Sequence, residues 1–516
     1  MITVRMLLRA GPFLGGLICD ALVAQDLIWT LKPPWYTGGG RFSTAIAAAG
    51  DLDQDGTVDV LVGAPKSEPT GKDDQVGQVF CFSGATGEIL FELNGEGLHH
   101  HFGRAVEGMP DLDLDGVLDF VVGAPQYGAP SNRIGRAYLY SGKLRDLLYE
   151  RTGENSGDEF GHVFAALDDL TGDGIDEWIV GALSNDEAMT EAGKAYVYSG
   201  PDGALIAEFL GTQRYQAFGM SASAVGDLDG GGRHDFLIGT AENAAGGGIG
   251  RAFLYSGETL SLIKEIVATS PYSEDFGLSL SCPGDVNGDQ VPDFLIGDPK
   301  DVERGSVSGR LYVYSGRTLL HLWSYYGEES DSLGSRHDGL GDLNMDGYAD
   351  FVVGTSDNLE PGAVLIYAGG SGRLLYRFRG REDTFEFGEI VAGIGDIDHD
   401  GIEDLAAGDL QFNRAYVYSG NDLFLDRSRR TAKESKPLAL FTRGGRAGAT
   451  TALYLVDVDG APAFDLLDVG RLGPYGERTL SGTVPPGLAG LKLGFRAYAQ
   501  SGRNILDSAI NLVEFE

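Results

Sequence analysis

The sequence predicts an all-β protein, a seven-bladed β-propeller of four-stranded blades followed by a small C-terminal β-sandwich-like domain. An acidic loop occurs seven times, at intervals of 54 to 60 residues. Each copy holds four short strand-like stretches joined by glycine-rich turns, and none contains a ten-residue run with helical period. Such units are typical of propeller blades, of which a ring usually has ~4–8. A linear β-array and a β-helix are the alternatives, although the repeats of a β-helix are usually shorter.

Each strand of a copy has its own pattern. The first strand follows an aromatic residue and a small one, as at Phe102-Gly103. The acidic loop comes next, and then a short apolar strand that ends in glycine, as at 120–123. The third strand alternates strictly, as at 136–142, and the fourth is short, as at 89–93. Period-two alternation with β-branched and aromatic residues is the signal of a β-strand.

The ring is expected to close through the N-terminus. The segment 27–31 has the pattern of the fourth strand at 89–93, whereas the seventh copy ends weakly at 423–425. We therefore expect strand 27–31 to complete blade 7, because closing the ring removes exposed strand edges.

The chain ends are expected to lie outside the propeller. Residues 1–24 read as a signal peptide, with Arg5 and Arg9 before a short apolar stretch and small residues before Gln25. The propeller is assigned to residues 25–425, a charged linker to 426–437, and a small β-sandwich-like domain to 438–516. That last domain could serve in docking or sorting, or could simply cap the chain.

Charge limits the partners. The formal net charge is −37, which argues against nucleic acid and against anionic membrane surfaces. No segment after the signal peptide approaches the ~18 unbroken apolar residues of a membrane span. We expect a monomer outside the cytoplasm, secreted to the extracellular space or the periplasm. Cys81 and Cys282 are too far apart to suggest a disulfide framework and are expected to be buried thiols.

The acidic loop has the chemistry of a calcium site. In the first copy, carboxylates occupy positions 1, 3, 5 and 9 of the segment 51–59, and Gly56 occupies position 6. Calcium takes six to eight oxygen ligands at about 2.3–2.6 Å, and glycine permits the positive-φ turn that wraps a loop around an ion. Position 7 would contribute its backbone carbonyl. Four carboxylates in one loop would also repel one another without a cation.

The sequence predicts up to seven Ca²⁺ ions. The fifth loop has Gln290 in place of the glycine, and the fourth has Gly231 where position 5 should supply an oxygen, so the fourth site is expected to be weak or empty. The predicted ligands are, loop by loop, Asp51, Asp53, Asp55, Thr57 and Asp59; Asp111, Asp113, Asp115, Val117 and Asp119; Asp169, Thr171, Asp173, Ile175 and Glu177; Asp227, Asp229 and Asp235; Asp285, Asn287, Asp289, Val291 and Asp293; Asp342, Asn344, Asp346, Tyr348 and Asp350; and Asp396, Asp398, Asp400, Ile402 and Asp404.

Two other interpretations of the loop are weaker. An EF-hand needs Glu at position 12 and flanking helices, but position 12 of the first loop is Val62, inside a strand. Simple Asx-rich turns would also use Asp and Gly. Seven copies in register make that explanation a poor one.

The repeat resembles a known family. Phe102-Gly103, the loop 111–119 and Gly123-Ala124-Pro125 together resemble the FG-GAP repeat of the integrin α-subunit propeller and of many bacterial secreted proteins. The resemblance covers about residues 27–430. It implies a seven-bladed propeller with calcium between the first and second strands of a blade, and binding or adhesion to proteins or glycans through one face.

An enzyme is the alternative function. Some propellers are polysaccharide lyases or hydrolases, and their paired carboxylates could not be told apart from calcium loops by sequence. No nucleophile elbow or phosphate loop stands out. The run His99-His100-His101 suggests a transition-metal site, but a solvated turn between the first two copies is the better explanation. No catalytic residue is therefore assigned.

Overall fold

The computed structural model describes the propeller and the strands of a second unit. The described residues are 27–420, except 35–39, 69–74, 129–132, 201, 242–247, 269, 271–272, 304–306, 329, 356–361 and 381–385. Outside this range the described residues are strands only, at 2–7, 437–443, 450–455, 465–471, 477–483, 492–501 and 504–514. The chain divides into two units, Leu27–Gly420 and the two flanking segments together.

Seven four-stranded sheets make up the first unit. The strands of blades 1 to 4 are β3 (Ala45–Gly50), β4 (Asp59–Ala64), β5 (Gln78–Phe82) and β6 (Ile89–Asn94); β7 (Ala105–Met109), β8 (Asp119–Ala124), β9 (Arg136–Tyr140) and β10 (Leu147–Thr152); β11 (Phe160–Ala166), β12 (Trp178–Ala182), β13 (Lys194–Tyr198) and β14 (Leu205–Leu210); and β15 (Ser221–Gly226), β16 (Asp235–Gly239), β17 (Arg251–Tyr255) and β18 (Leu262–Val267). Those of blades 5 to 7 are β19 (Ser279–Gly284), β20 (Asp293–Asp298), β21 (Arg310–Tyr314) and β22 (His321–Tyr326); β23 (Arg336–Gly339), β24 (Phe351–Thr355), β25 (Ala363–Tyr367) and β26 (Leu374–Arg379); and β27 (Phe387–Gly395), β28 (Asp404–Asp409), β29 (Arg414–Tyr418) and β2 (Leu27–Leu31).

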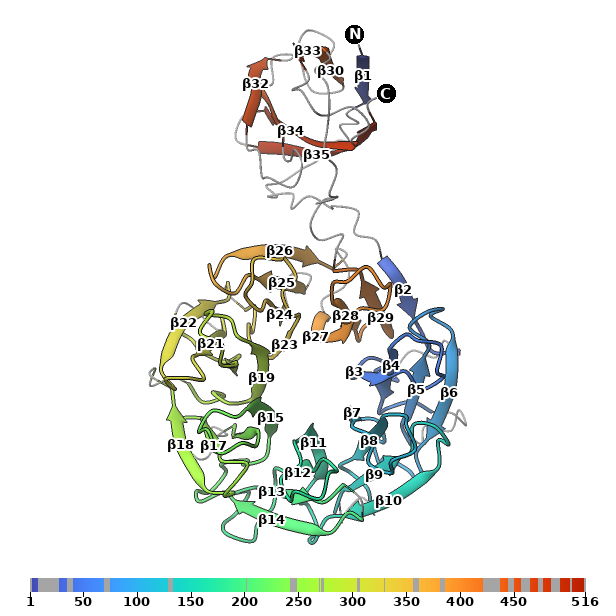
Figure 1. Cartoon of the computed structure of the whole chain (residues 1–516), viewed down its shortest axis with the longest axis vertical. Helices are drawn as coiled ribbons and strands as arrows, with labels where there is room; N and C mark the ends of the chain where they lie inside the picture. The colour runs from blue at the N-terminus through green and yellow to red at the C-terminus, as the bar shows by residue number, and fades with distance from the viewer. Residues whose placement is uncertain are drawn as a thin grey trace. The chain divides into compact units, whose positions relative to one another are not determined.

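The seven sheets stand around a ring (Figure 1). The first strand of each blade lies next to the axis, and the fourth lies at the rim. Within each of these seven sheets the neighbouring strands are antiparallel. The described residues contain no helix, so the predicted all-β class and the seven four-stranded blades are confirmed.

The chain start and the chain end of the propeller share one blade. Strand β2 pairs antiparallel with β29, with Leu27 opposite Tyr418 and Leu31 opposite Ala415. It forms the outer edge of blade 7, which otherwise contains β27, β28 and β29. The ring is thus closed by hydrogen bonds between strands that lie almost 400 residues apart in the sequence.

The hydrophobic core lies between blades rather than within them. One buried cluster joins Leu61 and Cys81 of blade 1 to Phe120 and Tyr138 of blade 2. Another joins blade 1 to blade 7, where Val62 and Phe80 pack with Val417. Each blade therefore buries its two faces against its two neighbours, which is the way in which stacked repeats form a continuous core.

Two sequence signatures meet at the boundary between blades. The aromatic residue before or at the start of the first strand is buried, as Phe102 and Phe160 show. The glycine after it donates its N–H to the carbonyl of a glycine in its own second strand, as from Gly103 to Gly123 over 3.0 Å. A Cβ on Gly123 would clash with the Gly161 carbonyl of the next blade, so the close approach of the two blades requires glycine here.

The second unit consists of two small sheets. One contains β1 (Ile2–Leu7), β30 (Pro437–Arg443) and β33 (Glu477–Thr483). The other contains β32 (Asp465–Arg471), β31 (Thr450–Leu455), β34 (Lys492–Ser501) and β35 (Asn504–Glu514). Strand β1 falls within the segment predicted as a signal peptide, and the rest of that segment lies outside the described residues. So does the predicted linker 426–437, except Pro437, which begins β30. Both assignments remain predictions.

The structure also bears on membrane spanning and on the two cysteines. Among the described residues, none forms a helix of the length and hydropathy needed to cross a membrane. Cys81 and Cys282 are free thiols, the first buried and the second half-buried.

Candidate metal centres

The seven acidic loops occupy equivalent places in the seven blades. Each connects the innermost strand of a blade to its second strand, as residues 51–58 connect β3 to β4. All blades have the same strand order, so their innermost strands run in the same direction along the axis of the ring. The loops at the ends of these strands therefore lie on one face of the propeller. The FG-type residues precede the same strands and therefore lie toward the opposite face.

The first loop shows how the chain wraps around its own carboxylates. Asp51 accepts hydrogen bonds from the N–H groups of Asp55 and Gly56, both at 2.9 Å. Asp53 accepts from the N–H of Asp55 at 3.1 Å, and Asp55 accepts from that of Thr57 at 2.9 Å. The backbone donors thus fix the side chains at positions 1, 3 and 5, and the carboxylates point inward as a calcium loop requires.

The carboxylate at position 9 has a second role, which the sequence did not reveal. Asp59 is fully buried and accepts from the N–H of Leu52 at 2.8 Å, within the loop. It also accepts from the N–H of Gly84 at 3.1 Å, at the end of the third strand. This residue therefore ties the loop to the turn between the third and fourth strands.

The second link recurs in five other blades. The glycine of a dipeptide after the third strand donates to position 9 in blades 2, 4, 5, 6 and 7 at 2.8–3.0 Å, through Gly142, Gly257, Gly316, Gly369 and Gly420. A Ser-Gly dipeptide at this place in most copies was the available signal. Its separation from position 9 varies from 16 to 25 residues, which hid the connection.

In five loops the carboxylates converge on one point. Ligand oxygens of three acidic residues lie within 4.8 Å of one another in loops 1, 2, 3, 4 and 7. The groups are Asp51, Asp53 and Asp59; Asp111, Asp113 and Asp115; Asp169, Asp173 and Glu177; Asp227, Asp229 and Asp235; and Asp396, Asp398 and Asp404. These oxygen-only groups have the chemistry of sites for hard cations such as Ca²⁺.

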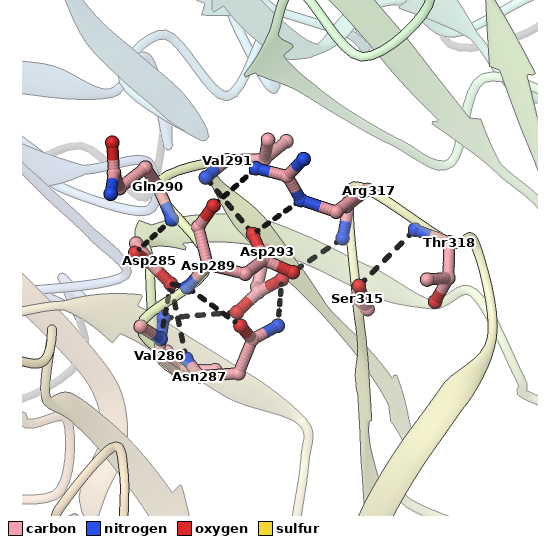
Figure 2. A network of polar contacts seen from close by, with 12 residues as sticks. Asp285, Val286, Asn287, Asp289, Gln290, Val291, Asp293, Ser315, Arg317 and Thr318 are labelled. Carbon is pink, nitrogen blue, oxygen red and sulfur yellow. Dashed lines mark hydrogen bonds and ion pairs between the residues drawn. The ribbon is translucent and has the colours of Figure 1, made fainter.

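In loops 5 and 6 asparagine occupies position 3. Figure 2 shows loop 5, where the amide nitrogen of Asn287 donates to Asp293 at 3.0 Å and its oxygen accepts from the N–H of Asp289 at 3.0 Å. Asn344 in loop 6 donates to Asp350 in the same way at 3.3 Å. Positions 1, 5 and 9 keep their hydrogen bonds, as Asp285, Asp289 and Asp293 show.

Loops 3 and 4 depart from the pattern. In loop 3 the longer side chain of Glu177 accepts from the N–H of Leu170 and from the hydroxyl of Thr171, the latter at 3.3 Å. In loop 4 Asp227 and Asp229 keep their backbone bonds, but Gly231 leaves position 5 without a side chain. The expectation that loop 4 is weak therefore rests on one absent oxygen, since its three carboxylates do converge.

Position 6 needs a left-handed backbone. Gly56 has a φ of 97° and Gly401 one of 90°. Gln290 adopts the same region with a φ of 68°, which is costly for a residue with a Cβ. The loop conformation therefore persists without glycine, and the N–H of Gln290 still reaches Asp285 at 2.6 Å.

Burial makes the position-9 carboxylates poor anions in the absence of a cation. Burial raises the pKa of Asp59, Asp119 and Asp293 to about 6, and that of Asp350 and Asp404 to about 7. Neighbouring loop carboxylates add to the rise, while the backbone donors oppose it. A cation at the centre of the loop would favour the ionised form.

The backbone carbonyls at position 7 remain predicted ligands. The N–H groups of these residues point to the carboxylate at position 5, as in Val117, Ile175, Val291, Tyr348 and Ile402 at 2.9–3.1 Å. The hydroxyl of Thr57 lies 3.1 Å from the ring nitrogen Nε2 of His399, so loop 1 touches loop 7.

The histidine run is more enclosed than a solvated turn. His99 is exposed, but the ring of His100 packs against Tyr127 with centroids 4.6 Å apart. Burial lowers the pKa of His100, and it lowers that of His101 to about 4. His100 and His101 are therefore packing residues at neutral pH.

The chain is similar to integrin α-subunits. It is 31% identical to human integrin alpha-IIb over 314 residues, which are 56% of this chain and 28% of the relative. It is 32% identical to integrin alpha-4 of Xenopus laevis over 214 residues, 39% of this chain and 20% of the relative. The match therefore spans less than a third of the length of these relatives. No family model matches the chain.

Proposed function

Starting from the confirmed resemblance to integrin α-subunits and from the seven-bladed ring, we propose that this chain is a secreted calcium-binding β-propeller that serves as a binding scaffold. Its ligand would be an extracellular protein or glycan. The observation that carries the proposal is the acidic loop itself, because in all seven blades its buried position-9 carboxylate accepts a hydrogen bond from a backbone N–H of the same loop.

The role of calcium is structural. An ion in each loop would offset the repulsion among its carboxylates and hold the first and second strands together. Through the position-9 residue it would also reinforce the link to the third strand, as between Asp59 and Gly84. The blades would then be rigid supports for the loops that contact a ligand, which is how propellers and other scaffolds commonly present binding residues.

Binding is favoured over catalysis by the similarity to integrin α-subunits. Secretion is supported by the predicted signal peptide, and a monomeric state is the simplest reading of a ring that is closed within one chain. Size-exclusion chromatography with light scattering tests the second point, and N-terminal sequencing of the exported protein tests the first.

Chelation should destabilise the protein. A ligand that binds only the folded state stabilises it by about 2.7 kcal/mol per site at a hundred times its dissociation constant. EGTA is therefore expected to lower the melting temperature, and Ca²⁺ but not Mg²⁺ is expected to restore it, because Mg²⁺ demands a tighter octahedral site. A melting temperature that chelation leaves unchanged would refute calcium binding.

The class of ligand needs a separate measurement. Glycan and extracellular-protein arrays should be probed with the full chain in Ca²⁺ and in EGTA, beside activity screens on polysaccharides. Calcium-dependent retention of one ligand class without turnover supports the scaffold. Depolymerisation of a polysaccharide would instead establish an enzyme.

A further inference from the structure

A second acidic cluster lies in blade 5, away from the loops. Strand β20 begins at Asp293, the position-9 residue of loop 5, and ends at Asp298. Five residues of extended strand separate the two carboxylates by about 16 Å. Asp298 therefore lies near the opposite face of the propeller, where Asp275 and Asp301 are also buried, at 3% and 0% exposure.

Asp298 has no donor at full hydrogen-bond geometry. It is 0% exposed, and neither of its carboxylate oxygens has a partner within that geometry, although the Ser273 hydroxyl is close enough to oppose part of the rise that burial causes in the pKa of Asp298. The nearby Ser273 hydroxyl lies 3.5 Å from Asp301 and 3.4 Å from the Tyr312 hydroxyl. An unpaired buried charge is strongly unfavourable, so such a group is expected to be neutralised in some way.

The neighbouring cations serve other carboxylates. Arg310 pairs with Glu303 at 2.6 Å, and its guanidinium stacks on the rings of Tyr312 and Tyr326 at 4.3 and 4.5 Å. Its Nη1 also lies 4.0 Å from Asp301, and it does not donate to Asp298, whose two oxygens have no partner within hydrogen-bond geometry. Lys300 pairs with Asp275 at 2.8 Å and is otherwise exposed.

The other blades provide an internal comparison. The residue at this place in the second strand is Ala64, Ala124 or Ala182 in blades 1 to 3, and in blade 7 it is Asp409, which is also buried but accepts from the N–H of Phe412 at 3.2 Å. Blades 4 and 6 have threonines whose hydroxyls bond to the third strand, as Thr355 accepts from the N–H of Ala363 at 3.0 Å. The fold therefore accepts a small residue here, and the Asp298 carboxylate is not needed to build the blade.

We propose that Asp298, Asp301 and Asp275 form a further site for a hard divalent cation, distinct from the seven loops. Four carboxylates, those of Asp275, Asp298, Asp301 and Glu303, face two cationic side chains, Lys300 and Arg310. One divalent ion balances the remaining charge. It also supplies the partner that both oxygens of Asp298 lack, and oxygen-only donors of this type suit Ca²⁺.

Binding requires a small rearrangement. The three carboxylates are not among the groups whose oxygens all lie within 4.8 Å of one another. Asp275 is held by Lys300, whose side chain is 61% exposed. Release of Lys300 into solvent lets Asp275 turn toward Asp298, and Ser273 is placed to complete the ligand set with its hydroxyl.

The test counts ions on the full chain. Native mass spectrometry and isothermal titration with CaCl₂ after EGTA treatment should give one ion fewer for Asp298→Ala than for the wild type. Thr355→Ala, which changes the same position in blade 6, should bind as many ions as the wild type. If the seven loops bind no calcium, the expected counts are one for the wild type and none for Asp298→Ala, so the two proposals are tested separately.

Stability distinguishes a metal ligand from a protonated, unpaired acid. In EGTA, Asp298→Ala should melt at or above the wild-type temperature, because alanine occurs at this position in three blades. In saturating Ca²⁺ the wild type should gain more than the variant. Equal ion counts for the two proteins would overturn the proposal and leave Asp298 as a buried acid that is kept neutral.

Discussion

The carboxylate at position 9 performs two structural tasks at once. In blade 2, Asp119 accepts from Leu112 at 2.8 Å and from Gly142 at 3.0 Å, and it is fully buried. Both of its oxygens are therefore needed as acceptors before any ion is considered. An amide at this position would have one acceptor and one donor, and its donor would face a backbone N–H.

Asp119→Asn should thus destabilise the protein even without calcium. We expect the free energy of unfolding in EGTA to fall by about 1–3 kcal/mol, the usual cost of leaving a buried donor unsatisfied. Urea unfolding measures it. Asp113→Asn is the matched control, because Asp113 is exposed and an asparagine oxygen can still accept from Asp115. Equal losses in the two variants would contradict the assignment.

A left-handed residue without glycine offers a second test. Gln290 has a φ of 68°, whereas the glycines at the same position have φ near 90°. Gln290→Gly is expected to raise the free energy of unfolding by about 0.5–1 kcal/mol, since relief of backbone strain exceeds the entropy that glycine adds to the unfolded chain. The reverse change in blade 6, Gly347→Gln, should destabilise. Thermal melts at fixed calcium measure both, and a destabilised Gln290→Gly variant would refute the strain.

At the level of the element, strand β2 holds the ring closed. Trp29 donates its indole N–H to the Gly84 carbonyl of blade 1 at 2.7 Å and packs against the cluster between blades 1 and 7. Trp323 occupies the same place in the outer strand β22 of blade 5, but its indole bonds to Tyr325 of its own strand. Substituting each tryptophan in turn therefore distinguishes the contribution of ring closure from that of packing within a blade.

Trp29→Ala should open the closure locally. Loss of a half-buried tryptophan costs about 2 kcal/mol, somewhat less than a fully buried one. Hydrogen exchange of β29, residues 414–418, is expected to accelerate in Trp29→Ala and to stay at the wild-type rate in Trp323→Ala. Similar protection of β29 in both variants would show that β2 does not secure the ring.

The sequence predicts elements better than it predicts the bonds between them. Regular spacing revealed the seven blades, and Leu333 could be placed beside the phenylalanines because it shares their position; it is equally buried. The bond from Gly84 to Asp59 was invisible because the intervening length differs among blades. Asp298 was overlooked because only one other blade has an aspartate at the end of its second strand, Asp409 in blade 7, and two of seven copies make no pattern. Periodicity reveals what repeats, whereas contacts across variable turns depend on the folded chain.

At the scale of the whole molecule, acidic side chains on the innermost strands of different blades repel one another. Glu107 on β7 of blade 2 and Asp338 on β23 of blade 6 interact although their blades are not neighbours. Burial, together with the Asp338 charge, raises the pKa of Glu107 to about 8 from an ordinary value of 4.5. Burial also raises the pKa of Asp338 to about 6, and burial together with the Asp338 charge raises that of Glu403.

This shift sets a pH dependence of stability. Between about pH 4.5 and 8 the unfolded chain has lost the Glu107 proton while the folded chain still holds it, so stability falls as the pH rises. Glu107→Gln mimics the neutral form and should leave stability unchanged near pH 4.5 but raise it at pH 8. Urea unfolding at both pH values, with the exposed Glu92→Gln as control, measures the difference. Parallel pH profiles of the wild type and Glu107→Gln would rule the shift out.

The closure of blade 7 also determines how the propeller bears mechanical load. Leu27 lies opposite Tyr418, so the two chain ends leave the ring side by side from one antiparallel pair. A force that pulls these two ends apart acts along the hydrogen bonds between β2 and β29, so it breaks them one after another. Force applied between a ligand on another blade and either single end is instead shared across the cores between blades. The same ring would therefore yield easily to tension between its own ends and resist tension transmitted through a bound partner.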